Sequence, residues 1–164
     1  TELQDPSKMQ TALDGLADLD AHVVLTTSMA IDPTDLTIPA NAHVVRYADH
    51  NAILSRADLC VTHGGHGTMM RALKHGVPMA VIPGFPHDQA PNAALIEKLG
   101  AGLALPGDAD ATALAQAAGR IIAGPSFKSS AEENAKVVQD LDGASSAAKL
   151  MESLVADNLT ETLA

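Results

Sequence analysis

The sequence predicts an α/β domain in which helices cover both faces of a Rossmann-like parallel sheet. Apolar runs of strand length alternate with stretches of helical periodicity as far as Leu105. These runs are nearly continuous, which is typical of strands buried on both faces. Strands and helices that alternate at this spacing imply right-handed crossovers between parallel strands.

The expected elements follow from local patterns and from glycines that end helices. Met9, Ala12, Leu13 and Leu16 share one helical face, and the helix that ends before Gly76 has Pro78 just beyond it. Strands are expected at 21–27, 43–47, 59–62, 79–82 and 102–105, and helices at 9–16, 51–55, 68–75, 89–99, 111–123, 127–142 and 145–156. Residues 1–156 are therefore expected to form one domain, and 157–164 a fraying tail.

Composition excludes several classes of protein. The chain has 164 residues, of which 46% are hydrophobic, so it is long and apolar enough to fold around a core. Its net charge of −10 argues against a surface for nucleic acid or anionic membranes. The single cysteine, Cys60, excludes an intramolecular disulfide and a thiolate zinc cage, and its place within a strand predicts a buried hydrophobe. No apolar run approaches the roughly 18 residues of a membrane span, so we expect no membrane partner and a cytoplasmic location.

The start of the chain differs from that of a usual doubly wound domain. Thr1, Glu2, Gln4 and Asp5 are polar and lead directly into a helix, whereas such domains normally begin with a strand. We therefore expect the chain to be a fragment of a longer protein that lacks its first strand. An exposed sheet edge would then favour self-association, for example as a homodimer, or pairing with a chain that supplies the strand.

The segment His63-Gly64-Gly65-His66-Gly67-Thr68 lies between a predicted strand and a helix expected to start near Thr68. Glycines at such a turn allow positive φ and close approach of a ligand, and the helix start offers free N–H groups to an anion. The segment matches neither a P-loop nor the dinucleotide pattern. It predicts a phosphate cradle, and the alternative is a tight turn whose glycines serve packing alone.

A metal site is not predicted in this turn. His63 and His66 are three residues apart across glycines, and no carboxylate follows at a ligand spacing. We also expect no cofactor.

The run from His63 to Leu105 resembles the donor-binding domain of family-one glycosyltransferases, which have the GT-B fold. Its elements follow in order: His-x-Gly-x-Gly/Asn-Ser/Thr, a helix, Gly-x-Pro, an apolar strand, Asp/Glu-Gln, Asn-Ala and Gly-x-Gly. The bacterial enzymes that glycosylate macrolides and other natural products are the most similar. The resemblance extends over the chain from about Thr1 to Val155, and it implies the C-terminal half of a GT-B fold.

The resemblance also implies roles for individual residues. His63 would bind the donor's diphosphate, together with the backbone of Gly64, Gly65, His66 and Gly67 and the hydroxyl of Thr68. Asp88 and Gln89 would hydrogen-bond the hydroxyls of the sugar. From the residues alone, Asp88 is better explained as the N-cap of the helix that begins at Gln89, a role compatible with sugar binding.

A second set of residues falls where the family binds the nucleoside. Tyr47 would stack on the base, Ala48 would offer main-chain groups, and Arg46 and His50 flank them, the latter near the ribose. The alternative for Tyr47 is a residue at a strand end that packs on a helix. Arg71 departs from the family, which commonly has a ribose-binding glutamate there, so this contact is in doubt and Arg71 could face solvent or a phosphate.

These similarities imply the donor-binding half of an inverting glycosyltransferase that transfers a sugar from a UDP- or dTDP-sugar to a natural-product hydroxyl. The catalytic base is expected in an N-terminal acceptor-binding domain of the same protein, so the present chain alone should be inactive. Two alternatives remain: a stand-alone nucleotide-binding regulatory module, and a GT-B epimerase or cell-wall glycosyltransferase.

Overall fold

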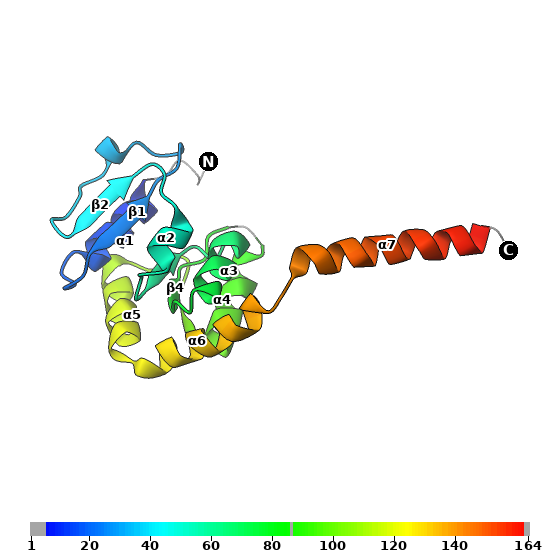
Figure 1. Ribbon diagram of the computed structural model, residues 1–164. Coiled ribbons are helices and arrows are strands. Elements are labelled where there is room, and N and C mark those ends of the chain that lie inside the picture. The colour runs from blue at the N-terminus through cyan, green and yellow to red at the C-terminus, as the bar shows by residue number, and fades with distance from the viewer. Residues whose placement is uncertain (1–5, 86, 163–164) are drawn as a thin grey trace.

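The computed structural model describes residues 6–85 and 87–162, in which strands and helices alternate up to β5 and three helices follow (Figure 1). The strands are β1 (Val23–Thr26), β2 (Ala42–Val45), β3 (Cys60–Thr62), β4 (Met79–Val81) and β5 (Gly102–Ala104). The helices are α1 (Ser7–Leu16), α2 (His50–Leu54), α3 (His66–Lys74), α4 (Gln89–Lys98), α5 (Ala111–Ala123), α6 (Pro125–Gln139) and α7 (Gly143–Thr162), with a 3-10 turn, η2 (Pro33–Asp35). Every predicted strand and helix is therefore present.

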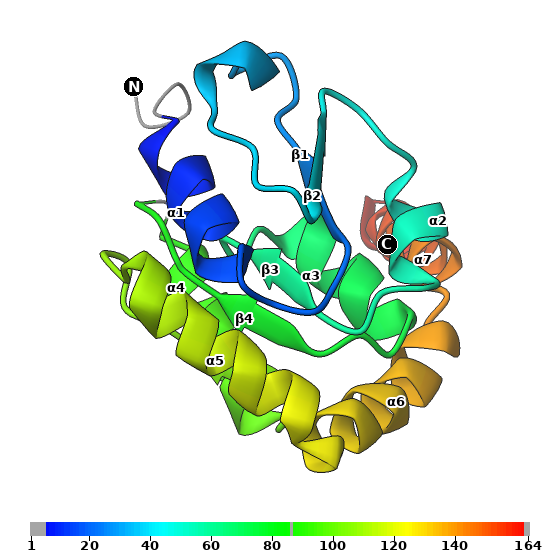
Figure 2. The same ribbon diagram turned by 90° about the vertical axis from the view of Figure 1, so that its left-hand side faces the viewer.

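The strands pair in parallel, as predicted, but they form two sheets and not one. Strand β1 pairs with β2, with Val23 opposite Ala42, and β3, β4 and β5 form a separate sheet in that order. Figure 2 shows the β1–β2 pair above β3 and β4 in the same body. The order corresponds to a doubly wound sheet with the strand between β1 and β3 left out. None of the described residues forms that strand, which is why the two sheets are separate.

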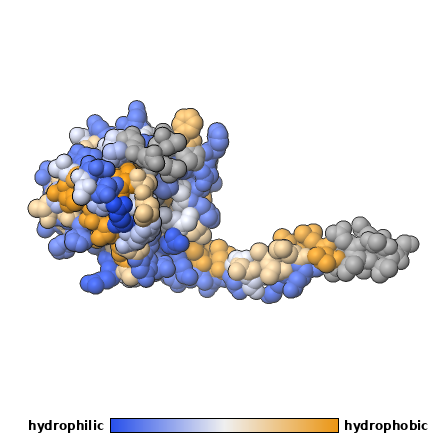
Figure 3. Space-filling view, turned by 90° about the horizontal axis from the view of Figure 1, so that it is seen from above, coloured by the Kyte–Doolittle hydropathy of each residue, from blue (hydrophilic) through white to orange (hydrophobic). Residues whose placement is uncertain are grey.

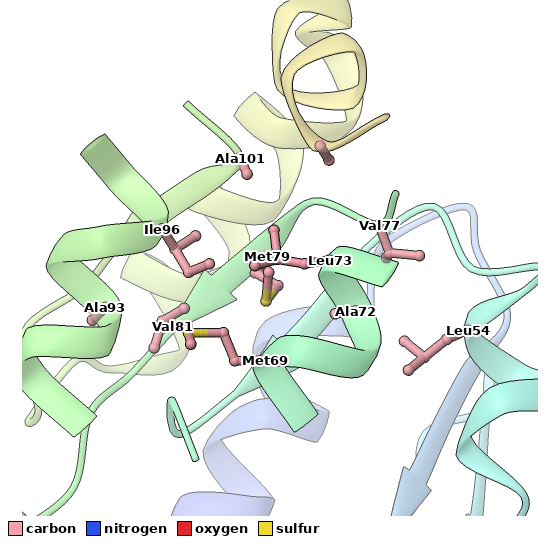
Figure 4. Packing of buried hydrophobic residues seen from close by; sticks show 11 residues of the cluster. Leu54, Met69, Ala72, Leu73, Val77, Met79, Val81, Ala93, Ile96 and Ala101 are labelled. Carbon is pink, nitrogen blue, oxygen red and sulfur yellow. The ribbon is translucent and has the colours of Figure 1, made fainter. Parts of the chain in front are cut away.

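Strand β4 lies at the centre of the core and packs helices on both of its faces. Its residues Met79 and Val81 face a cluster formed with α3, α4 and α6, and Figure 4 shows them between Met69 and Ile96. Ala80, on the opposite face, contacts the second cluster, which α5 and α1 supply. All three β4 residues are fully buried. The prediction of helices on both faces is thus confirmed for this sheet.

Several helix boundaries differ from those expected, and three of the differences bear on the site or on the shape of the chain. Helix α3 begins at His66, not Thr68, because Gly65 takes an extended conformation and its carbonyl accepts the amide of Met69. Helix α6 begins at Pro125, which suits the first helical turn. Helix α7 continues to Thr162, through residues expected to be a fraying tail, and projects away from the body (Figure 1). None of the helices in the described ranges is long and apolar enough to cross a membrane.

Candidate functional site

The candidate site lies where β3 and β4 end. The turn after β3 holds the His63–Gly65 segment, and the loop after β4 leads to Asp88 and Gln89. Because β3 and β4 are adjacent and parallel, both loops open at the same edge of the sheet. This edge, at the carboxyl ends of the strands, is where open α/β sheets bind ligands.

The turn itself is shaped by Gly64. Its φ of +87° is a conformation that side chains rarely adopt, and an added Cβ would lie 3.0 Å from both the carbonyl oxygen of Gln89 and Cγ1 of Val81. The amide of Gly64 donates to Oγ1 of Thr62, and its carbonyl accepts from Nδ2 of Asn92 at 2.8 Å. Packing and backbone geometry together therefore require a glycine here, so the packing interpretation holds for this position.

The start of α3 has a different character. The N-cap residue Gly65 has no side chain to cap the helix, and the first amide bonded to it is that of Met69. The amides of His66, Gly67 and Thr68 have no partner within the part of the chain that the structure describes. A Cβ added at Gly67 would meet nothing within 4 Å, so this face of the turn is open. Free N–H groups at the positive end of a nine-residue helix can hold an anion.

His63 lies over this turn. A Cβ added at Gly65 would come within 2.5 Å of Nε2 of His63, so the imidazole ring covers the glycine. His63 is exposed, which leaves its ring nitrogens accessible to a ligand at the start of α3. The structure thus brings together all six residues of the predicted cradle.

Asp88 and Gln89 differ in their surroundings. Asp88 occupies the N-cap position of α4, but its side chain makes no capping hydrogen bond, so the capping interpretation is wrong. Its carboxylate is exposed and available. Gln89 is only 7% exposed, and its Oε1 accepts the amide of Gly84 at 2.6 Å. Gln89 therefore holds the loop in place, which leaves its Nε2 as the group that could reach a ligand.

The predicted nucleoside residues are only partly brought together. Ala48 and His50 line a cavity of about 220 Å³ with Asp49, Asn51 and Arg71. Tyr47 is 67% exposed, so it does not pack on a helix as the alternative required. His50 Nε2 lies 3.3 Å from Oγ1 of Thr26.

Arg46 is engaged elsewhere. Its guanidinium forms an ion pair with Asp32, and it is not among the residues that line the cavity. The pKa of Asp32 lies below its ordinary value because the amide and hydroxyl of Thr34 donate to the carboxylate and Arg46 adds its charge. Arg46 therefore fixes the loop after β1 against β2, and its predicted contact with a nucleoside would compete with this pair.

Three residues of the site were missed from the sequence. Asp49 caps α2 by accepting the amides of Asn51 and Ala52, a role that its place before a helix could have revealed. Phe85 lies in the loop before Asp88 and is 82% exposed. The chain has only two phenylalanines, so a phenylalanine in a loop was a signal that the sequence offered. Asn92 gave no signal, because its partner Gly64 is 28 residues away.

Cys60 lies in β3, where it is partly buried and packs against the core around β4. Burial raises the pKa of the Cys60 thiol to about 11, so the thiol is protonated at neutral pH, in keeping with its predicted role as a hydrophobic residue. Among the described residues, no three His, Cys, Asp or Glu side chains are placed to share a metal ion.

Comparison with known proteins agrees with this geometry. Residues 10–156 match the family model described as the C-terminal domain of erythromycin biosynthesis protein CIII-like proteins. The chain is 31% identical over 159 residues to the aclacinomycin-T 2-deoxy-L-fucose transferase of Streptomyces galilaeus, with 94% of this chain and 35% of that protein covered. The chain spans about a third of the length of such relatives.

Solved glycosyltransferases have the same fold. The calicheamicin glycosyltransferase CalG4 superimposes with a TM-score of 0.81 at 25% identity, covering 92% of this chain and 38% of that protein. The glycosyltransferase VinC, solved in complex with DTDP, superimposes with a TM-score of 0.71 at 30% identity, covering 79% and 33%. These matches confirm the predicted resemblance and the GT-B half-fold. The chain therefore belongs to the family of erythromycin biosynthesis protein CIII-like C-terminal domains, which is part of the natural-product glycosyltransferases.

Proposed function

We propose that the chain is the donor-binding half of an inverting glycosyltransferase. In this proposal the enzyme transfers the sugar of a UDP- or dTDP-sugar to a hydroxyl of a small natural product, and UDP or dTDP leaves. The names of its relatives support transfer of deoxysugars and related sugars, and VinC was solved with DTDP. The observation that carries the proposal is the open start of α3, where three free amides lie beside His63.

This arrangement suits a diphosphate leaving group. Negative charge grows on the diphosphate as the bond to the sugar breaks, and donors already fixed in place stabilise it without reorganising. The amides of His66, Gly67 and Thr68 are fixed by the helix, and Gly64 and Asn92 hold the turn before it.

The remaining residues would recognise the two ends of the donor. Asp88 would accept hydrogen bonds from sugar hydroxyls, and Gln89 would add one donor through Nε2. The exposed ring of Tyr47 would stack on the base, with Ala48 and His50 near the ribose.

The acceptor and the catalytic base belong to another part of the protein in this proposal. Relatives are about three times as long as the matched segment, which leaves room for an acceptor-binding domain. Helix α7 offers a surface to that domain: it stands outside the body, and Figure 3 shows hydrophobic residues along it. Its exposed apolar side chains are Leu150, Met151, Leu154 and Val155.

We also propose that the longer protein supplies the strand between β1 and β3. Each of these strands has a sheet partner on one side only among the described residues. A parallel strand between them would join the two sheets in the doubly wound order.

Calorimetry with UDP, dTDP and the free sugar tests the proposal. Nucleoside diphosphates should bind more tightly than free sugar, because the free amides address the diphosphate. His63→Ala should weaken nucleotide binding by about 1.5–3 kcal/mol, the value of a hydrogen bond to a charged group. His22→Ala is the matched control, because His22 is also exposed but precedes β1. It therefore lies at the amino end of a strand, whereas the site lies at the carboxyl ends of β3 and β4.

Two results would contradict the proposal. Equal affinity for sugar and nucleotide would show that the turn before α3 does not bind a diphosphate. An unchanged affinity for nucleotide in His63→Ala would show that His63 does not contact it. A full-length protein that binds nucleotide but transfers no sugar would instead favour the regulatory-module alternative.

A further inference from the structure

The cavity of about 220 Å³ joins two parts of the site that are separate in sequence. Ala48, Asp49, His50 and Asn51 come from the segment that starts α2, whereas Arg71 comes from α3. The cavity is smaller than the roughly 300–1,000 Å³ of a complete small-molecule site. It therefore suits one portion of a larger ligand that continues beyond it.

Arg71 lies on the same face of α3 as the open helix start. The core-facing side of α3 is formed by Met69, Ala72 and Leu73, which are almost completely buried (Figure 4). Arg71 is exposed, and Gly67 and Thr68 precede it by four and three residues, which places them on one helical face. Helical side chains lean toward the N-terminus, so the free amides lie in the direction that the long Arg71 side chain favours.

The charge of Arg71 is not compensated within the described part of the chain. Arg71 has neither a hydrogen bond nor an ion pair there, unlike Arg46, which Asp32 holds. Asp49, the acidic residue among those that line the cavity, uses Oδ1 to accept the amides of Asn51 and Ala52 at 2.9 and 3.3 Å. An isolated cation in a protein of net charge −10 is unusual at a site open to an anion.

We propose that Arg71 forms an ion pair with a phosphate of the bound nucleotide, and so adds to the preference of the site for a nucleoside diphosphate over a nucleoside. This inference rests on the proposed function, because it places the diphosphate at the start of α3. The planar guanidinium can bond two phosphate oxygens at once, while Asp49 and Asn51 offer acceptors and donors for ribose hydroxyls. Arg71 thus adds a charge contact that the backbone amides alone do not provide.

The test is calorimetric titration of the chain with UDP and with uridine. Arg71→Ala should lower the affinity for UDP about tenfold, the scale of one charge-assisted hydrogen bond, and leave that for uridine within about twofold. Arg71→Lys keeps the positive charge but cannot bond two phosphate oxygens at once, so its affinity for UDP should lie between those of Arg71→Ala and the unaltered chain. The salt dependence of UDP binding should also be shallower in Arg71→Ala, because an exposed ion pair is screened.

Arg120→Ala is the matched control. Arg120 is also exposed, and its replacement by alanine removes the same charge. It lies on α5, however, which covers the opposite face of the sheet. The Arg120→Ala variant should bind UDP with the same affinity as the unaltered chain. A surface substitution such as Arg71→Ala should leave the melting temperature unchanged, which circular dichroism would verify.

The outcomes separate the two proposals. If the unaltered chain binds UDP and Arg71→Ala binds it equally well, the role of Arg71 is refuted while the proposed function stands. Equal losses for UDP and uridine would also refute it, because Arg71 would then shape the cavity without contacting phosphate. If the unaltered chain binds neither UDP nor dTDP, the proposed function and this inference both fail.

Discussion

Replacing Gly64 or Gly67 by alanine separates the two roles that glycines have in the turn before α3. Gly64 has φ of +87°, and an added Cβ would approach the Gln89 carbonyl and Val81 to 3.0 Å. Gly67 is helical, and an added Cβ would meet no atom within 4 Å. The first substitution should therefore affect folding, and the second should affect only a ligand.

The magnitudes follow from these environments. For Gly64→Ala, a left-handed backbone conformation costs about 1–2 kcal/mol, and the close contacts add about 1–2 kcal/mol more. The total of about 2–4 kcal/mol corresponds to a melting temperature about 5–15 °C lower for a chain of this size. For Gly67→Ala, alanine favours the helix by up to about 1 kcal/mol, so stability should stay equal or rise slightly.

For nucleotide binding we expect Gly67→Ala to have a large effect, although it should not lower stability. The Cβ at position 67 would tilt toward the N-terminus of α3, where the diphosphate is proposed to lie. Displacing a phosphate from one amide should weaken binding about tenfold to a hundredfold. Thermal unfolding followed by circular dichroism and calorimetry with UDP measure the two effects on the same samples.

The reasoning would be refuted by either of two results. An unchanged melting temperature in Gly64→Ala would mean that the turn does not need its positive φ. Full affinity for UDP in Gly67→Ala would show that the diphosphate does not approach this face of the helix.

Further predictions concern other parts of the site and the sheet. In the full-length enzyme, Asp88→Asn should lower turnover about thirtyfold, from loss of about 2 kcal/mol in a charge-assisted bond, while the affinity for free UDP stays the same; normal turnover would exclude Asp88 from the sugar site. The Cys60 thiol, with its pKa raised to about 11, should have only about one thiolate in a thousand at pH 8, so iodoacetamide should modify it far more slowly in the native chain than in denaturant; equal rates would contradict its burial. Amides of β1 and β3 that face the gap should exchange hydrogen faster in this chain than in the full-length protein, and equal protection would argue against a strand between them.

Local patterns predicted the elements well because they depend on residues near one another in sequence. Gly76 and Gly100 end helices with φ of +63° and +67°, which only a glycine adopts readily, so both stops were visible from the sequence. Helix α5 has the predicted limits, because Asp110 caps it and its apolar positions recur at helical spacing.

The position of the glycine-rich turn before α3 was predicted for the same reason. Its glycines and His63 are contiguous, and a strand before them and a helix after them are both local features. What each glycine does could not be predicted, because the atoms that require Gly64 belong to Gln89 and Val81, and those come from other elements.

The sequence by itself determined the helices, the strands, their parallel arrangement and the glycine-rich turn before α3, because apolar periodicity and glycine stops act over a few residues. Only the tertiary structure decided that the strands form two sheets, that Gln89 is bonded to Gly84 while Asp88 is free, and that Arg71 faces the segment before α2. These features depend on contacts between distant segments, or on the choice between a local hydrogen bond and solvent. Such choices are decided by how the elements pack, and local propensity does not encode them.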